Sequence, residues 1–245
     1  MSEIELFHFT SSHFNEKARW TLELKRVPHS RTSFLPGPHL APVQKLTGGS
    51  TVPAIRDSGV VIAGSAEIID HLEAKFPEPA LYPEDPAQRE RALAIQREFD
   101  DEVGPAVRLA LFFDVLDGEF ATAAFAVDKS AAAKLAYRVS FPLIHPIMIK
   151  RIGINAESAT VARDRVTQAL DFVVKESAET GYLVGDRFSV ADLCCASLLM
   201  LTARVGEFGG PDMHSNERVD SWLARWADHP GTDWVREIFR RHRRP

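Results

Sequence analysis

The chain has 245 residues, of which 45% are hydrophobic and 26% charged, so it can bury one large core or two modest ones. Its formal net charge of -5 argues against nucleic acid or an anionic membrane as a partner of the whole molecule. The sequence offers no run of ~20 apolar residues for a membrane span. Its first residues, MSEIELFHF, lack the basic flank and apolar core of a secretory signal. These features predict a cytoplasmic globular protein.

The first eighty residues alternate between strand and helix patterns. Asp57-Ser58-Gly59 separates two short apolar runs and predicts a tight hairpin turn. The resulting order βαβαββα predicts an α/β domain over residues 1–77. Its expected strands are 4–9, 31–34, 53–56 and 60–63, and its expected helices are 15–25, a short piece ending at Thr47 and 66–75.

A polar segment rich in proline, residues 78–86, suits a linker better than any regular element. Strand patterns then largely vanish, which predicts an all-α domain over residues 87–245. A long helix over 87–116 is expected to kink or break at Gly104-Pro105. Pro142 and Pro146 interrupt the apolar run 139–149. The remaining expected helices are 129–139, 160–179, 190–203, 218–227 and 233–241.

Four motifs occur in a characteristic order: FHFTSSHFNEKARW at 7–20, TVPAI at 51–55, GSAEIIDHLE at 64–73 and YLVGDRFSVADL at 182–193. With the βαβαββα order, they make the chain resemble the cytosolic glutathione transferase superfamily over essentially its whole length. The resemblance implies a thioredoxin-like domain that binds glutathione as cosubstrate, followed by a helical domain that binds a small electrophile. It also implies a homodimer.

The strand-to-helix corner at Ser11, Ser12 and His13 carries no cysteine. In the resembling family a Tyr, Ser or Cys at this corner contacts the glutathione sulfur. Counting back from Lys17-Ala18-Arg19, which is similar to a family motif, places Ser12 there, with Ser11 as the alternative. A serine hydroxyl can donate to a thiolate, and a helix N-terminus adds positive potential. Thiol–disulfide exchange would need a protein thiol here.

Two other interpretations of this corner stay open. Ser12 could be only the N-cap of the first helix. His13 could act as a base but is expected to be exposed and uninvolved, and Arg19 is expected to pair structurally. The only cysteines, Cys194 and Cys195, are adjacent in an apolar helical run, which predicts small core residues without a mutual disulfide.

The resemblance places the rest of the glutathione site on two further motifs. It implies a cis bond between Val52 and Pro53, which would turn the Val52 main chain toward the cysteinyl backbone of glutathione. Ser65, expected to cap a helix, would bind the γ-glutamyl carboxylate at that helix N-terminus. The chain departs from the family pattern at two positions, with Thr51 where a lysine is typical and Gly64 where an acid is typical. Glu67, in the first turn, is a candidate replacement for the missing acid.

The acceptor site is expected along the long helix, near Arg108, Phe112 and Phe113. Ser189 and Asp192 form a capping-box pattern, which we interpret as structural. No metal-ligand spacing, Gly-rich phosphate loop or Gly-x-Ser-x-Gly motif occurs in the sequence. Two rivals to a glutathione transferase remain: a non-catalytic binding or assembly protein with this fold, and a transferase that uses another small thiol.

Overall fold

The structure is a computed structural model that describes residues 4–208 and 216–243. The chain forms two compact units, each built from two separate stretches. Residues up to Pro79 and Asp117–Met148 make the first unit, and Ala80–Leu116 with the residues from Ile149 onward make the second. Within the described residues, no helix is both long enough and apolar enough to cross a membrane.

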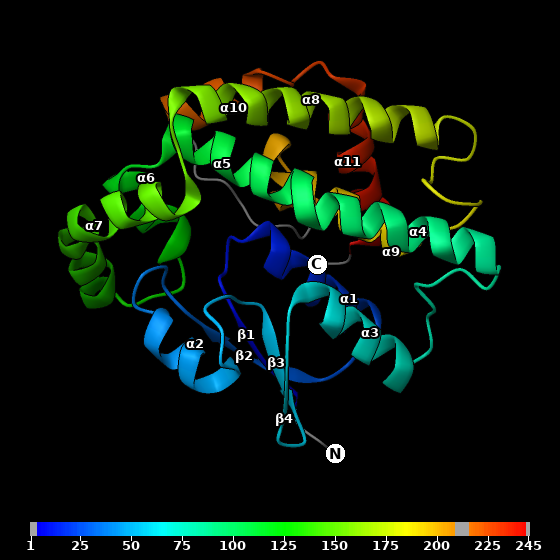
Figure 1. Cartoon of the computed structure of the whole chain (residues 1–245), viewed down its shortest axis with the longest axis horizontal. Coiled ribbons are helices and arrows are strands. Elements are labelled where there is room, and N and C mark those ends of the chain that lie inside the picture. The colour runs from blue at the N-terminus through cyan, green and yellow to red at the C-terminus, as the bar shows by residue number, and fades with distance from the viewer. Residues whose placement is uncertain (1–3, 209–215, 244–245) are drawn as a thin grey trace. The chain divides into compact units, whose positions relative to one another are not determined.

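The first unit contains a four-stranded mixed sheet of β1 (Ile4–His8), β2 (His29–Ser33), β3 (Ala54–Asp57) and β4 (Val60–Ala63), in the order β2-β1-β3-β4 (Figure 1). β1 pairs in parallel with β2 and antiparallel with β3, and β3 pairs antiparallel with β4. Ser58 and Gly59 join β3 to β4, both with positive φ, which confirms the predicted hairpin turn. The helices between and after these strands are α1 (His13–Leu24), α2 (Leu40–Thr47) and α3 (Ser65–Lys75).

Helices cover both faces of this sheet because side chains alternate along each strand. Leu6 in β1 and its partner Ile55 in β3 point toward α1 and α3, whereas Phe7 and Ala54 point toward α2. The first face buries Ile4, Leu6, Ala18, Leu22, Val27, Ile55, Ile68 and Leu72. The order βαβαββα and the α/β fold class are therefore confirmed.

Two further helices, α6 (Gly118–Phe125) and α7 (Ala131–Ile152), contribute to the first unit as far as Met148. They are tied to β2 and the loop after it. Lys129 Nζ donates to the Ser33 carbonyl over 2.8 Å, and the buried Tyr137 hydroxyl donates to the Pro36 carbonyl over 3.0 Å. Ile144 lies 3.0 Å from where a Cβ would stand on Gly37. A segment expected in the helical domain thus packs with the sheet.

The described residues of the second unit form helices and loops, without a strand. Its elements are α4 (Pro86–Glu98), the π-helical η1 (Phe99–Val103), α5 (Gly104–Val115), α8 (Ala156–Ser177), α9 (Val190–Leu199), the 3-10 segments η2 (Met200–Thr202) and η3 (Gly206–Phe208), α10 (Glu217–Ala224) and α11 (Pro230–His242). The expected all-α region after the linker is confirmed as a fold class, and the boundaries 1–77, 78–86 and 87–245 stay a prediction.

The expected interruption of the long helix is present, and two other helical details differ from the sequence-based predictions. The long helix changes to π-helical geometry immediately before Gly104-Pro105, where proline supplies no N–H for the α-helical ladder. α6 was not predicted. α7 runs unbroken through Pro142 and Pro146, because both prolines are exposed and solvent can satisfy the carbonyls that their missing N–H groups leave free.

Candidate functional site

The β1–α1 corner places Ser12 at the N-cap of α1, with extended backbone angles. The Ser12 Oγ accepts from the Asn15 backbone N–H over 3.4 Å and from Asn15 Nδ2 over 2.8 Å. A hydroxyl has two acceptor lone pairs and one donor hydrogen. Asn15 engages the lone pairs, so the Ser12 hydrogen remains available to donate. Capping the helix and donating to a ligand are therefore compatible roles for Ser12.

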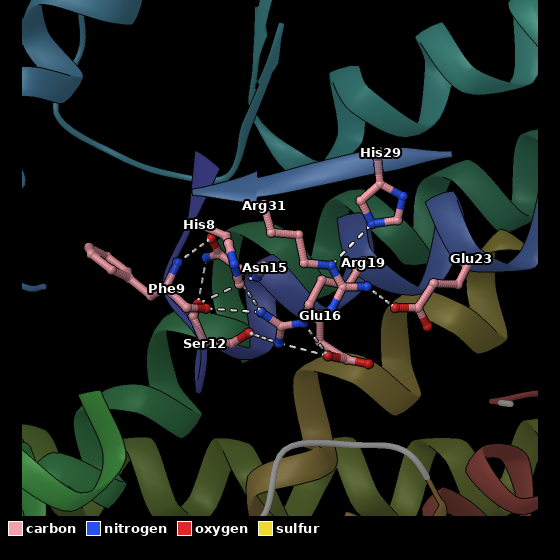
Figure 2. Close-up of polar contacts among 9 residues, drawn as sticks. All are labelled: His8, Phe9, Ser12, Asn15, Glu16, Arg19, Glu23, His29 and Arg31. Carbon is pink, nitrogen blue, oxygen red and sulfur yellow. Dashed lines mark hydrogen bonds and ion pairs between the residues drawn. The ribbon is translucent and has the colours of Figure 1, made fainter. Parts of the chain in front are cut away.

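Asn15 links three parts of this corner and was not predicted from the sequence (Figure 2). Its Oδ1 accepts from the Phe9 backbone N–H over 3.0 Å, and its Nδ2 donates to Ser12 Oγ and to the Val52 carbonyl over 3.2 Å. The side chain is fully buried. A polar residue three positions after an N-cap serine was the available signal, because it occupies the second position of a capping-type pair. Its contact with Val52 spans 37 residues and left no local signal.

Arg19, a residue of α1, forms hydrogen bonds to the same corner (Figure 2). Its Nη1 donates to the Phe9 carbonyl over 3.0 Å, and its Nη2 donates to the Ser12 carbonyl over 3.3 Å. Its Nε donates to the Glu16 carboxylate over 2.8 Å. Arg19 is 4% exposed and Glu16 is 1% exposed, so this is a buried ion pair. Arg19 therefore pairs structurally, as the sequence predicts.

His8 closes the network at the end of β1. Its Nδ1 lies 3.0 Å from Arg19 Nη1 and, because arginine can only donate, Nδ1 must be the acceptor. Burial, then the positive charges of Arg19 and Arg31, lower the pKa of His8 to about 3, although Asp128 acts in the opposite direction. The ring is therefore neutral at physiological pH.

The lowered pKa of His8 predicts that the folded protein loses stability in acid. An unfolded histidine has a pKa near 6.5 whereas His8 has a pKa of about 3, so stability is fully present above about 6.5 and is lost as the pH falls toward 3. One proton changes the free energy of unfolding by about 1.4 kcal/mol per pH unit. We expect His8→Asn, which keeps an acceptor, to reduce the stability loss between pH 6.5 and pH 5 by about 1.6 kcal/mol. Denaturant titrations at both pH values test this, and an unchanged difference would contradict it.

The residues next to Ser12 differ in burial and in hydrogen bonding. Ser11 is half-buried in the turn that ends where the Ser12 N–H donates to the Phe9 carbonyl over 3.3 Å. The prediction that His13 is exposed is wrong: it is 3% exposed, because it lies on the inward side of the first turn of α1. The Thr10 Oγ1 is buried and has no hydrogen-bond partner among the described residues. Thr10 is thus a third hydroxyl at this corner that sequence reasoning missed.

Val52 and Pro53 lie just before β3, and the bond between them is cis, as the resemblance implies. Val52 is 8% exposed, and its carbonyl accepts from Asn15. Thr51 before it is exposed. The Val52 main chain is thus hydrogen-bonded to Asn15, the side chain that also contacts Ser12.

At the start of α3 the structure corrects one expectation: Gly64, not Ser65, is the N-cap. Gly64 has φ +105°, a conformation that glycine adopts readily, and Ser65 is the first helical residue, 7% exposed. A Cβ on Gly64 would stand 1.9 Å from Glu67 Oε2. The Glu67 carboxylate therefore occupies the space that a side chain at position 64 would fill.

Arg108, Phe112 and Phe113 lie on α5 in the second unit. Arg108 and Phe112 are one turn apart and half-buried, whereas Phe113 is 41% exposed and the Arg163 guanidinium lies 5.2 Å from its ring centroid. Arg108 Nε is buried without a hydrogen-bond partner among the described residues. Phe113 thus packs toward α8, and Arg108 has no ion-pair partner within residues 4–208 and 216–243.

The late motif has the structural arrangement that we predicted. Asp192 accepts from the backbone N–H groups of Ser189, over 2.9 Å, and Leu183, over 2.8 Å. Burial raises the pKa of Asp192 to about 6 even though these bonds favour the charged form. Cys194 and Cys195 are both buried and are not joined by a disulfide, as the sequence predicts.

Comparison with known proteins gives two family matches in chain order. The profile described as "Glutathione S-transferase, N-terminal domain" matches residues 6–80, and "Glutathione S-transferase, C-terminal domain" matches residues 86–225. A search of curated protein sequences finds no significant match.

Solved structures with the same fold have low sequence identity to this chain. A Methylobacterium radiotolerans glutathione S-transferase in complex with glutathione sulfonate is 19% identical, with TM-score 0.65, over 99% of this chain and 95% of that one. The theta-class enzyme of Xanthomonas axonopodis pv. citri with glutathione bound is 19% identical, with TM-score 0.57, over 99% and 97%. The beta-etherase LigF of Sphingobium is 20% identical, with TM-score 0.60, over 97% and 99%. The two family profiles together span most of the sequence, and the chain belongs to the glutathione S-transferase family.

Proposed function

We propose that this protein is a glutathione-dependent transferase in which Ser12 stabilises the glutathione thiolate. The observation that carries the proposal is the bonding of Ser12: both acceptor positions of its hydroxyl are engaged by Asn15, which leaves its hydrogen to donate at the N-terminus of α1. Ser11 is the alternative donor. The protein supplies no thiol at this corner, so the nucleophilic sulfur comes with the ligand.

The energies are sufficient for this role. A free thiol with a pKa near 8.5 is about 3% ionised at pH 7, and lowering the pKa by about two units requires about 2.7 kcal/mol. A hydrogen bond to a charged group contributes roughly 1.5–3 kcal/mol and a helix N-terminus roughly 0.3–1 kcal/mol. The thiol proton leaves to solvent, and the thiolate attacks an electrophilic carbon. A C–S bond forms as the bond to the leaving group breaks.

The residues around the corner fit the peptide part of glutathione. The Val52 main chain, between Thr51 and Pro53, would pair with the cysteinyl backbone, and Ser65 with the N-terminus of α3 would hold the γ-glutamyl carboxylate. Gly64 supplies no acid for the γ-glutamyl amine. We assign that role to Glu67, whose carboxylate fills the corresponding space.

The acceptor would be a small, predominantly apolar electrophile held against α5 by Arg108, Phe112 and Phe113. We propose a cytoplasmic homodimer, because members of the resembling family usually have this form.

Two assays separate this function from its rivals. They are retention on immobilised glutathione, and conjugation of glutathione to a chlorinated nitroaromatic acceptor. A glutathione transferase gives retention and turnover, a non-catalytic module gives no turnover, and an enzyme for another thiol turns over only with that thiol. The departures at Thr51 and Gly64 favour the rivals, whereas the position of Glu67 favours glutathione.

The assignment of Glu67 gives a separate prediction. Glu67→Gln removes the negative charge that would pair with the γ-glutamyl ammonium, so we expect the KM for glutathione to rise about 5- to 30-fold with little change in kcat. Asp70→Asn, one turn further along α3, is the matched control. Steady-state kinetics at saturating acceptor test this. An unchanged or lower KM in Glu67→Gln would show that the carboxylate does not bind glutathione.

A further inference from the structure

Arg108 in the middle of α5 is a partly buried cation without a counter-ion among the described residues. Its Nε is buried and makes no hydrogen bond, and neither terminal nitrogen makes a hydrogen bond or ion pair to any described residue. Burial lowers the pKa of its guanidinium from the ordinary value, and no charged group in the described part of the chain offsets that effect. The second unit thus holds this charge at a cost.

Three other arginines of the second unit differ from Arg108 because each has a counter-ion. Arg163 and Arg225 both pair with Asp114, the second over 3.3 Å. Arg165 pairs with Glu98 over 2.9 Å and also with Glu102. The acids before and after Arg108 in sequence, Glu102 and Asp114, are therefore engaged by other arginines.

A buried charge without a partner is destabilising, and groups in strained electrostatic environments cluster at binding sites. The guanidinium is a planar fork of donors that matches the two oxygens of a carboxylate and resists neutralisation. Phe112, one helical turn from Arg108 and half-buried, offers an apolar ring on the same side of α5. The pair suits a ligand with an aromatic body and a carboxylate.

We propose that Arg108 binds the carboxylate of an anionic aromatic acceptor, so that the transferase prefers acid electrophiles to neutral ones. This inference rests on the proposed function for its catalytic readout, but binding of the acid can be measured without turnover. The carboxylate bound could instead be one of glutathione's own. In that case the loss of Arg108 would change the KM for glutathione and not the KM for the acceptor.

The kinetic test uses two acceptors that differ only in charge, 4-chloro-3-nitrobenzoate and 4-chloro-3-nitrobenzamide. In Arg108→Met we expect kcat/KM for the benzoate to fall about 10- to 100-fold, mostly through KM, and that for the benzamide to change less than about threefold. Arg108→Lys should restore part of the preference, because lysine keeps the charge but loses the fork. Arg163→Met, which breaks a pair already satisfied, should leave the ratio of the two acceptors unchanged.

Calorimetry with the unreactive 3-nitrobenzoate and 3-nitrobenzamide keeps the inference testable if no conjugation is found. Tighter binding of the acid that is lost in Arg108→Met supports the site even if the protein is not a transferase. The inference would be overturned if Arg108→Met lost affinity for the acid and the amide equally, or if it changed only the KM for glutathione. It would also be overturned if the unmodified protein showed no preference for the acid.

Discussion

Ser12→Ala is expected to lower kcat/KM for glutathione conjugation at pH 7 by about 10- to 150-fold, the equivalent of one hydrogen bond to a charged group. Without the hydroxyl donor, the pKa of the bound thiol should rise toward that of free glutathione, and less thiolate forms at neutral pH. The loss should therefore shrink as the pH is raised. Thiolate absorbance and the pH dependence of kcat/KM measure the shift directly.

The same substitution removes an N-cap, which is worth about 1 kcal/mol, so stability must be measured alongside activity. Ser30→Ala, at an exposed serine of the edge strand β2, is the matched control. A Ser12→Ala enzyme with normal turnover, combined with loss of turnover in Ser11→Ala, would place the sulfur one residue earlier. Normal turnover in both variants would exclude a serine donor.

Arg19→Met is expected to destabilise the first unit by about 3–5 kcal/mol. It removes the Arg19 guanidinium from a buried ion pair with Glu16, and it removes the donors that Arg19 supplies to the carbonyls of Phe9 and Ser12. Denaturant unfolding gives the magnitude. The β1–α1 corner should also loosen, so we expect activity to fall in the fraction that remains folded.

The control for Arg19 is Arg31→Met, which breaks an exposed pair with Glu23 and should cost no more than about 1 kcal/mol. The double variant Arg19→Met with Glu16→Leu should recover part of the stability, because it also removes the buried negative charge that Arg19 had balanced. A loss in Arg19→Met no larger than that in Arg31→Met would show that the buried pair does not hold the corner.

The sequence predicted those features that depend on neighbouring residues or on a family motif. The sequence βαβαββα along the chain, the hairpin at Ser58 and Gly59, and the capping pair of Ser189 and Asp192 follow from local patterns of hydrophobicity, turn residues and capping. Ser12 was placed at the helix start by its spacing from the Lys17-Ala18-Arg19 motif.

The features that it missed depend on contacts between distant residues. Asn15 reaches Val52 across 37 residues, and Tyr137 reaches Pro36 across 101. Helical periodicity identifies the apolar face of a helix but not the unit against which that face packs. The sequence therefore assigned α7 to the helical domain. The sequence shows that position 64 lacks the acid typical of the family. It does not show that the Glu67 carboxylate occupies the space beside Gly64.

The division of the first unit between two stretches of chain, up to Pro79 and from Asp117 to Met148, bears on the order of folding during synthesis. The ribosome releases the sheet early but must still make α4, η1 and α5 before the partners of Ser33 and Pro36 emerge. A fragment that stops near residue 80 leaves those contacts unmade. The nascent sheet should therefore resist proteolysis fully only after Met148 has left the exit tunnel.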